Sequence, residues 1–206
     1  MKKIKLLILI AFFPALIIAQ GVEVVPFAGY MFGGSVKYYE GKLKVDDGVN
    51  YGVSLLIPVQ SLVDVEINYT RMNSRASFRS YSGYPLVSDY DIENLSTNYI
   101  QVGGISKFYS SNTKVAPFGS FSVGATWFTA PDISAVWKFS VTAGLGVKIM
   151  LSDRIGIMLR GRLMMPMSFA GTSFYFGSGG SGLSLNSVVA PFQGDFNGGL
   201  IIKLGN

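Results

Sequence analysis

The sequence predicts an all-β fold, an eight-stranded antiparallel up-and-down transmembrane β-barrel. The first observation is that apolar and polar side chains alternate along eight segments, which is the period of a β-strand. The second is that 49% of the residues are apolar and only 14% are charged, whereas about a quarter of a soluble domain is charged. The third is that the connections between these segments are in large part alternately short and long, as in barrels that cross a membrane.

The N-terminus predicts a secretory signal peptide over residues 1–20, followed by one barrel domain over residues 21–206. Lys2, Lys3 and Lys5 precede an apolar run that ends at Ala19. A membrane anchor is the alternative, but the run is shorter than the about 20 residues of a spanning helix. Removing the three lysines leaves 14 basic residues against 12 acidic ones and lowers the formal charge from +5 to +2. We therefore expect no nucleic-acid partner.

The predicted strands follow in chain order, at residues 22–32, 50–59, 63–70, 100–108, 115–127, 137–150, 155–167 and 194–204. The first strand opens on Val25-Pro26-Phe27, and the second holds an apolar stretch, 55–59, that is far too short for a helical span. The third alternates plainly between apolar and acidic or polar residues, and the fourth and fifth are rich in glycine and serine.

The last three strands repeat the alternation, and the charged residues on their polar face are all basic except Asp195. Four of the eight strands carry two charges each, and in every pair both charges fall on the same face of the strand. A soluble barrel would turn this charged face outward, whereas a barrel in lipid turns it inward. The small, polar residues of this face and its few charges favour the inward direction.

An eight-stranded barrel is just wide enough for its own side chains to fill the lumen. Six positive and four negative residues are expected inside, namely Glu23, Asp64, Glu66, Lys107, Lys138, Lys148, Arg160, Arg162, Asp195 and Lys203. They should form an ion-pair network, because unpaired buried charge is costly. Its expected centre has Glu66 and Asp64 facing Arg160 and Arg162. The favoured interpretation is a plugged lumen, and the alternative is a gated or narrow selective pore.

Aromatic side chains on the apolar face cluster toward one end of six strands. They are Tyr30, Phe32, Tyr51, Tyr69, Trp127, Trp137, Phe139 and Phe196. Amphipathic rings of this kind form a girdle at a membrane interface.

Composition limits the chemistry of the chain. It has no Cys and no His, so disulfide scaffolds, zinc sites and Ser-His-Asp catalysis lack their residues. We expect no enzymatic activity, no cofactor and no metal site. A soluble exported barrel that binds a small apolar ligand in its interior is the alternative function.

Three long connections, at about 33–49, 71–99 and 168–193, hold the remaining information. The middle one places Arg71, Arg75 and Arg79 beside tyrosines. One interpretation is an extracellular surface whose arginines contact lipopolysaccharide phosphates. The favoured one is a solvated connection whose strands project beyond the membrane. The residues do not identify an extracellular partner.

Several stretches carry a family resemblance: Val25 to Tyr30, Ala116 to Gly119, Ile155 to Leu163, Asn98 to Gly104, and the ending Gly199 to Gly205. Over nearly all of residues 21–206, the chain resembles the outer-membrane β-barrel superfamily, with small eight-stranded barrels such as OmpX, OmpW and the OmpA barrel, and in particular its Bacteroidetes members of porin-family type. The resemblance implies a structural or surface-interaction role with small-solute passage as an option. It also implies a location in the bacterial outer membrane, lipid and lipopolysaccharide as neighbours, and the barrel-assembly machinery as a partner during biogenesis. The family's assembly signal ends in an aromatic residue, whereas this chain ends Leu204-Gly205-Asn206.

Overall fold

A computed structural model describes residues 21–37, 41–81, 89–110, 114–131, 133–177, 180–189 and 192–205. The predicted signal peptide, residues 1–20, lies outside the described residues. In the ranges given, no helix has the length and hydropathy needed to cross a membrane.

Among the described residues, eight antiparallel strands close into a ring. Around the ring they are β1 (Glu23–Phe32), β4 (Gly48–Gln60), β5 (Val63–Ser80), β6 (Tyr90–Lys107), β7 (Val115–Ala130), β8 (Ile133–Met150), β9 (Ile155–Gly177) and β11 (Gln193–Lys203). The ring closes because β11 pairs with β1, from Glu23 opposite Lys203 to Phe32 opposite Gly194. The predicted eight-stranded antiparallel barrel is confirmed.

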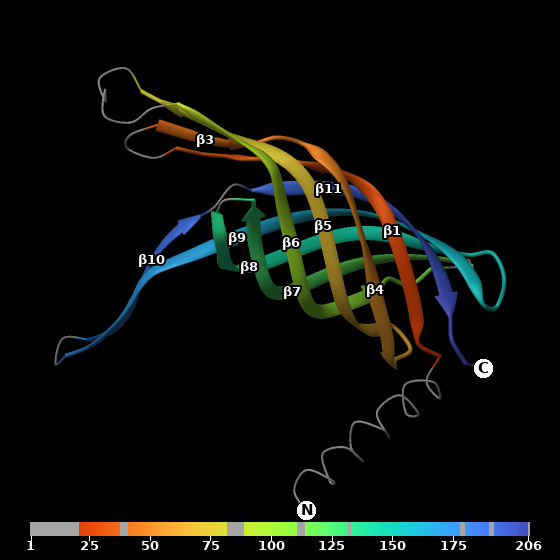
Figure 1. The fold of residues 1–206 in the computed structure, drawn as a ribbon. Helices are drawn as coiled ribbons and strands as arrows, with labels where there is room; N and C mark the ends of the chain where they lie inside the picture. The colour runs from red at the N-terminus through yellow and green to blue at the C-terminus, as the bar shows by residue number, and fades with distance from the viewer. Residues whose placement is uncertain are drawn as a thin grey trace, which may run out of the picture.

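One end of the ring, called here the short-turn end, carries the tight connections and the start of β1 (Figure 1). At the other, projecting end, the strands run further than the sequence predicted. The third strand extends ten residues beyond position 70, to Ser80, and the fourth begins at Tyr90 rather than at residue 100. The reason is that backbone groups beyond residue 70 still pair with each other, so β5 and β6 continue as one ladder.

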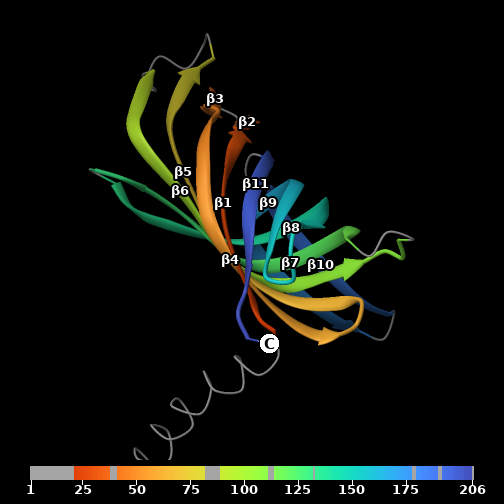
Figure 2. The same cartoon turned by 90° about the vertical axis from the view of Figure 1, so that its right-hand side faces the viewer.

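The projecting end carries additional strands within the predicted long connections. β2 (Ser35–Lys37) pairs with β3 (Gly41–Val45), which pairs with the outer part of β5, and β10 (Gly180–Val189) pairs with β9. We call β2, β3 and the outer parts of β5 (71–80) and β6 (90–97) the projecting sheet. The strands continue into the predicted connection between residues 71 and 99, in line with the favoured interpretation, whereas the expectation of strand boundaries at residues 70 and 100 is wrong. In Figure 2 the outer ends of β5 and β6 point away from those of β7 and β8.

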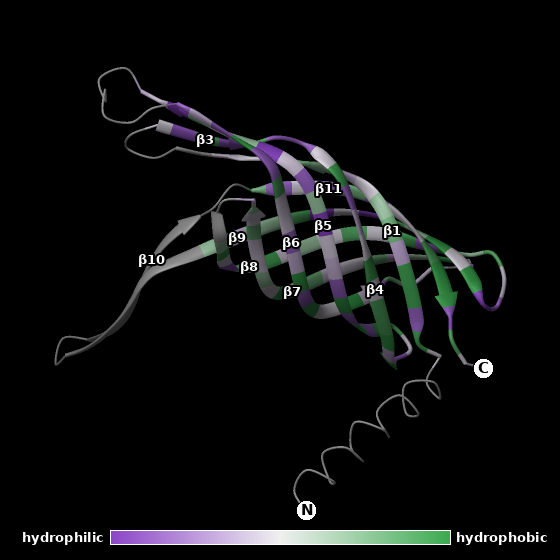
Figure 3. Cartoon of the chain, viewed as in Figure 1, coloured by the Kyte–Doolittle hydropathy of each residue, from purple (hydrophilic) through white to green (hydrophobic). Residues whose placement is uncertain are grey.

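Apolar side chains face outward from the ring and polar ones face inward. Phe196, Leu145 and Trp137 expose 69%, 68% and 62% of their surface, whereas Arg160 and Asp195 expose 3% and 2%. Figure 3 shows this alternation along the ring strands and mainly hydrophilic residues on the outer ends of β3, β5 and β6. The alternative of a soluble barrel with an apolar interior is therefore wrong, because its charged face would have to meet water.

Two apolar layers cross the interior, which the sequence did not predict. The lower layer, toward the short-turn end, consists of Val25, Leu56, Ile105, Phe118, Met158 and Ile201. The upper layer, toward the projecting end, consists of Met31, Val45, Met72, Ala76, Leu95, Tyr99 and Met164. Large rings fit because glycines lie beside them: a Cβ on Gly146 would stand 2.5 Å from the Phe118 ring, and one on Gly52 would stand 2.7 Å from the Phe27 ring.

Candidate functional site: the barrel interior

The centre of the lumen holds a buried ion pair between β9 and β5. Nη1 of Arg160 donates to Oε1 of Glu66 at 2.6 Å, and the two side chains are 1% and 4% exposed. The same Glu66 oxygen accepts the hydroxyl of Ser54 at 2.6 Å. Alternation places Arg160 and Glu66 on the inward face of strands on opposite sides of the lumen, so the pair joins the walls across the barrel.

A second buried pair lies beside the first. Nη2 of Arg162 lies 2.5 Å from Oδ2 of Asp195, and its Nε donates to the other carboxylate oxygen at 3.0 Å. Asp195 also accepts from the Asn50 amide at 2.5 Å. The ring of Phe27 lies 5.3 Å from the Arg160 guanidinium and 5.1 Å from that of Arg162. Because an aromatic face attracts cations, Phe27 stabilises both arginines where water is excluded.

A third group of charges lies nearer the short-turn end. Nζ of Lys148 bridges Oε2 of Glu23 at 2.8 Å and Oδ2 of Asp64 at 2.7 Å, while Lys107 binds the other Asp64 oxygen at 2.9 Å. The prediction that Arg160 faces Glu66 is confirmed, but the prediction that Asp64 faces the arginines is wrong. Asp64 precedes Glu66 by two residues on β5, so it sits one inward position lower, at the level of the lysines.

Two predicted lumen residues lie at the edges of this arrangement. Lys203 is directly across from Glu23 in the β1–β11 register, at the short-turn end. Lys138 is opposite Thr126 in the β7–β8 register, toward the projecting end, and is partly exposed. Neither belongs to the two central pairs.

Between the arginine pairs and the projecting end, neutral polar groups fill the lumen. The Gln101 amide donates to Thr142 at 2.6 Å and to Ser140 at 3.3 Å, which joins β6 to β8. Above it, the Tyr99 hydroxyl donates to the Gln193 side-chain oxygen. The chain therefore fills its interior with polar bonds between walls as well as with ion pairs.

The side chains of the described interior are almost completely inaccessible to water. Tyr99, Met164 and Met31 in the upper layer expose 0%, Gln101 1%, and Phe118 in the lower layer 1%. The charged level between these layers is equally covered. A water-filled channel would expose the side chains along its length, so the described residues form a packed plug.

The predicted aromatic girdle lies on the outward face. Tyr30, Phe32, Tyr51, Trp137, Phe139 and Phe196 are exposed, and Tyr69 and Trp127 are partly so. Trp127 stacks on Trp137 at 4.7 Å, and Tyr69 lies 6.2 Å from Trp127. On the other side of the ring, Phe32 contacts Tyr30 at 5.5 Å and Phe196 at 6.2 Å, edge to face.

Sequence reasoning missed the inward aromatics Phe27 and Phe118; it placed Tyr99 on the face opposite the girdle but did not assign it to the lumen. A signal was available for Phe27 and Phe118, because each occupies the same face of its strand as predicted lumen residues or glycines. It was overlooked because that face was expected to carry only small, polar or charged residues. Within the described ranges, no cluster of three or more His, Cys, Asp or Glu side chains could hold a metal ion.

The closed ring, its inverted polarity and its girdle can now be compared with known proteins. The structure of Neisserial surface protein A, NspA, superposes with a TM-score of 0.59 at 14% sequence identity, over 89% of this chain and 97% of that chain. The chain has the fold of a small outer-membrane β-barrel. The N-terminal barrel domain of OprF from Pseudomonas aeruginosa matches at a TM-score of 0.46 and 11% identity, over 89% of this chain and 98% of that one. No protein-family model and no curated protein matches the sequence.

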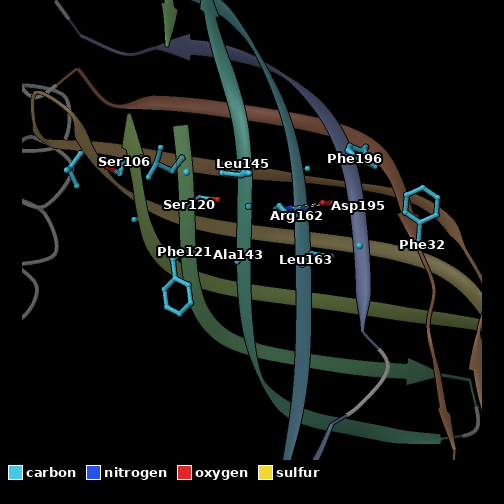
Figure 4. A pocket seen from close by; sticks show the side chains of 17 residues that line it. Phe32, Ser106, Ser120, Phe121, Ala143, Leu145, Arg162, Leu163, Asp195 and Phe196 are labelled. Atoms are coloured by element: carbon cyan, nitrogen blue, oxygen red, sulfur yellow. Dashed lines mark hydrogen bonds and ion pairs between the residues drawn. The ribbon is translucent and has the colours of Figure 1, made fainter. Parts of the chain in front are cut away.

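The outward face of this outer-membrane barrel fold carries an apolar groove of about 1120 Å³ that runs across neighbouring strands (Figure 4). Phe121, Leu145, Leu163 and Phe196 stand along it, and each is more than half exposed. Figure 4 also shows Arg162 and Asp195 joined within the wall. The groove is continuous with the apolar outward face of the ring.

Proposed function

We propose that this chain is a bacterial outer-membrane barrel with a closed lumen, which displays its projecting sheet at the cell surface for contact with other molecules. The packed interior carries this proposal, because a barrel plugged by its own side chains at three levels offers no path for solutes. In this proposal residues 1–20 direct export and are removed, and the barrel-assembly machinery inserts the remaining chain. The short-turn end then faces the periplasm and the projecting sheet faces outward.

The projecting sheet supports a role in surface contact. It continues β5 and β6 well beyond the girdle and carries exposed charged side chains, among them Lys42, Arg75 and Arg79. Arg79 pairs with Asp91 at 2.7 Å across the β5–β6 ladder, with both side chains more than half exposed. A rigid, hydrogen-bonded sheet positions such groups better than a loop does, which suits recognition more than simple closure of the barrel.

Passage of water or very small solutes is the second candidate, and one observation favours it. In the upper part of the lumen Thr97 Oγ1, Thr126 Oγ1 and Gln193 Nε2 are buried without a hydrogen-bond partner among the described residues. Buried polar atoms of this kind are commonly satisfied by water. A hydrated path would have to cross both apolar layers, which is why the closed barrel is preferred.

Single-channel recording in planar bilayers tests the closed lumen. We expect no unitary steps from the wild-type barrel, with insertion verified by protease protection in matched vesicles. The triple variant Tyr99→Ala, Phe118→Ala and Arg160→Ala removes one large side chain from each of the three levels and should conduct. A control variant, Tyr51→Ala with Phe121→Ala, trims the outward face and should stay silent. Clear wild-type steps that change in Arg160→Ala would overturn the closed-lumen proposal.

A further inference from the structure

The apolar groove on the outward face of the ring (Figure 4) alternates large and small side chains in two adjacent rows. Across β6, β7, β8, β9 and β11, the strand registers place in one row Gly104, Phe121, Ala143, Leu163 and Gly194. The second row, two residues nearer the short-turn end on each strand, contains Ser106, Gly119, Leu145, Gly161 and Phe196. Within these rows every large side chain has only small residues as neighbours. We call Phe121, Leu145, Leu163 and Phe196 the knobs, and the positions of the small residues the hollows.

The packing of this chain does not itself require the hollows. At the lumen glycines Gly52 and Gly124, an added Cβ would lie 2.0 Å from a backbone oxygen. Apart from chain neighbours, a Cβ on Gly104 would meet no atom nearer than 3.8 Å, and one on Gly194 none nearer than 3.6 Å. Glycine inside a strand has no side chain to pack, and it often marks a place where a ligand or another backbone approaches closely. The hollows therefore indicate an approach from outside the ring.

The opposite side of the ring lacks such hollows. β4 and β5 lie opposite β8 and β9 in the order of strands around the ring. Their described outward positions from 49 to 57 and from 63 to 69 carry only large side chains, namely Val49, Tyr51, Val53, Leu55, Ile57, Val63, Val65, Ile67 and Tyr69. Acyl chains surround a barrel on every side, so contact with lipid does not account for hollows that lie opposite a uniformly bulky face.

Two copies of a surface with knobs and hollows can pack against each other in a membrane. Lipid tails are as apolar as these side chains, so association depends on close packing, and small residues let two backbones approach. A contact around a twofold axis uses the same surface on both copies, so this surface must be complementary to itself. The groove offers both knobs and hollows, and none of the residues in its two rows is charged.

The size of this face matches what a dimer needs. Neighbouring strands lie about 4.8 Å apart, so the five strands span about 19 Å, and the apolar band of a barrel is about 25 Å tall. Contact over this face buries about 500 Å² on each copy, or about 1,000 Å² in total, which is where specific protein contacts begin. The knobs add to this area, because each is more than half exposed. Insertion into one bilayer also orients both copies in advance, which lowers the rotational cost of association.

We propose that the groove docks a second copy of this chain, so that the barrel is a dimer in the membrane. The knobs of each copy enter hollows of the other, on the side of the ring that carries β7, β8 and β9. The inference rests on the proposed membrane location and goes beyond the proposed closed lumen and surface contact. Both projecting sheets then lie at the same surface, and a ligand that contacts both is held more tightly than by one alone.

Energy transfer between labelled copies in phosphatidylcholine vesicles tests the dimer. The sequence has no Cys, so Asp153→Cys, in the exposed turn between β8 and β9, provides one thiol for a donor or an acceptor dye. The full chain is labelled in two batches, which are mixed and inserted together. We expect the energy transfer of a dimer to persist when the vesicles are diluted with excess lipid.

Filling the hollows distinguishes the groove from other contacts. Gly104→Leu with Gly194→Leu places two large side chains where a Cβ has open space, so the barrel itself should fold as before. Overpacking of the contact between copies should weaken the dimer about 10- to 100-fold. The matched control, Val49→Leu with Val53→Leu, enlarges the opposite side of the ring and should dimerise like the wild type. A gel shift between unboiled and boiled samples checks the fold of each variant.

Two outcomes would overturn the proposal. Energy transfer that falls in proportion to lipid dilution in the wild type would indicate a monomer whose groove is covered by lipid or by another protein. Dimerisation that is equally strong in the filled variant would place the contact elsewhere on the ring. The proposed function is judged separately by single-channel recording. A monomeric, non-conducting barrel refutes this inference alone, whereas a dimer that conducts refutes the closed lumen alone.

Discussion

Removing one partner of the central ion pair should reveal whether the lumen is dry. In Glu66→Gln the carboxylate is replaced by a neutral amide of the same shape, and Arg160 keeps its charge. The pair is 2.6 Å long and its side chains are 1% and 4% exposed. An uncompensated charge at such a buried site costs about 3–5 kcal/mol. The same pair bathed in water would contribute at most about 1 kcal/mol.

Urea unfolding in phosphatidylcholine vesicles, followed by tryptophan fluorescence, measures this difference. We expect Glu66→Gln to lower the free energy of unfolding by about 3–5 kcal/mol. The double variant Glu66→Leu with Arg160→Met removes both charges and should return to within about 1–2 kcal/mol of the wild type, because well-packed apolar residues often replace buried pairs without loss. A loss below about 1 kcal/mol in Glu66→Gln, with additive effects in the double variant, would refute the packed lumen and indicate a hydrated one.

The remaining predictions concern packing, cation–π contact and pH. Gly146→Ala should lower the free energy of unfolding by about 1–3 kcal/mol, because its Cβ would lie 2.5 Å from the Phe118 ring. In the control variant Gly194→Ala, the Cβ makes only an ordinary contact at 3.6 Å. The control should therefore lower the free energy of unfolding by less in the same urea assay. Phe27→Leu should lower the free energy of unfolding by about 2 kcal/mol, because it removes the cation–π contacts with two guanidinium groups. A similar decrease in the outward variant Phe121→Leu would contradict this cause. Hydrogen bonds from the Ser80 backbone N–H and hydroxyl hold the pKa of Asp89 below its usual value. Asp89 therefore stabilises the pairing of β5 with β6 at pH values above the ordinary carboxyl pKa. This stabilisation is lost as the pH falls through the lowered pKa of Asp89. Hydrogen exchange at the Ser80 amide, corrected for intrinsic rate, should show less protection at pH 2 than at pH 6, and Asp89→Asn should abolish the difference.

The strand pattern of the ring was predictable because each strand has one apolar face that points outward. That constraint places Ile155, Ile157 and Leu159 outward, and it forces Arg160 and Arg162 inward together. The projecting sheet was not predictable in the same way. Beyond residue 70 the polarity of β5 reverses, because Met72 and Ala76 are buried in the upper layer and polar residues take the opposite face. The pattern that marks a ring strand is therefore lost, although the ladder continues to Ser80.

The sequence predicted that opposite charges pair inside the lumen, but it did not determine every partner. Because an unpaired buried charge is costly, basic and acidic side chains in the lumen have to pair, and the Arg160–Glu66 pair follows from this requirement. The choice between Asp64 and Asp195 as partner of Arg162 depends on the stagger between strands. In the structure β11 is the direct neighbour of β9, and it brings Asp195 opposite Arg162 in the register. Asp64 is left to Lys148 and Lys107 because it lies one inward position below Glu66.

The inverted polarity of the barrel is tested most directly by the depth of its tryptophans. The chain has two, Trp127 and Trp137, and they stack on each other in the girdle. In vesicles with brominated phospholipids, we expect strong fluorescence quenching by bromines near the headgroup end of the acyl chains and weak quenching by bromines at the chain ends. Quenching by aqueous iodide with no response to any brominated lipid would contradict a barrel whose apolar face lies in the membrane.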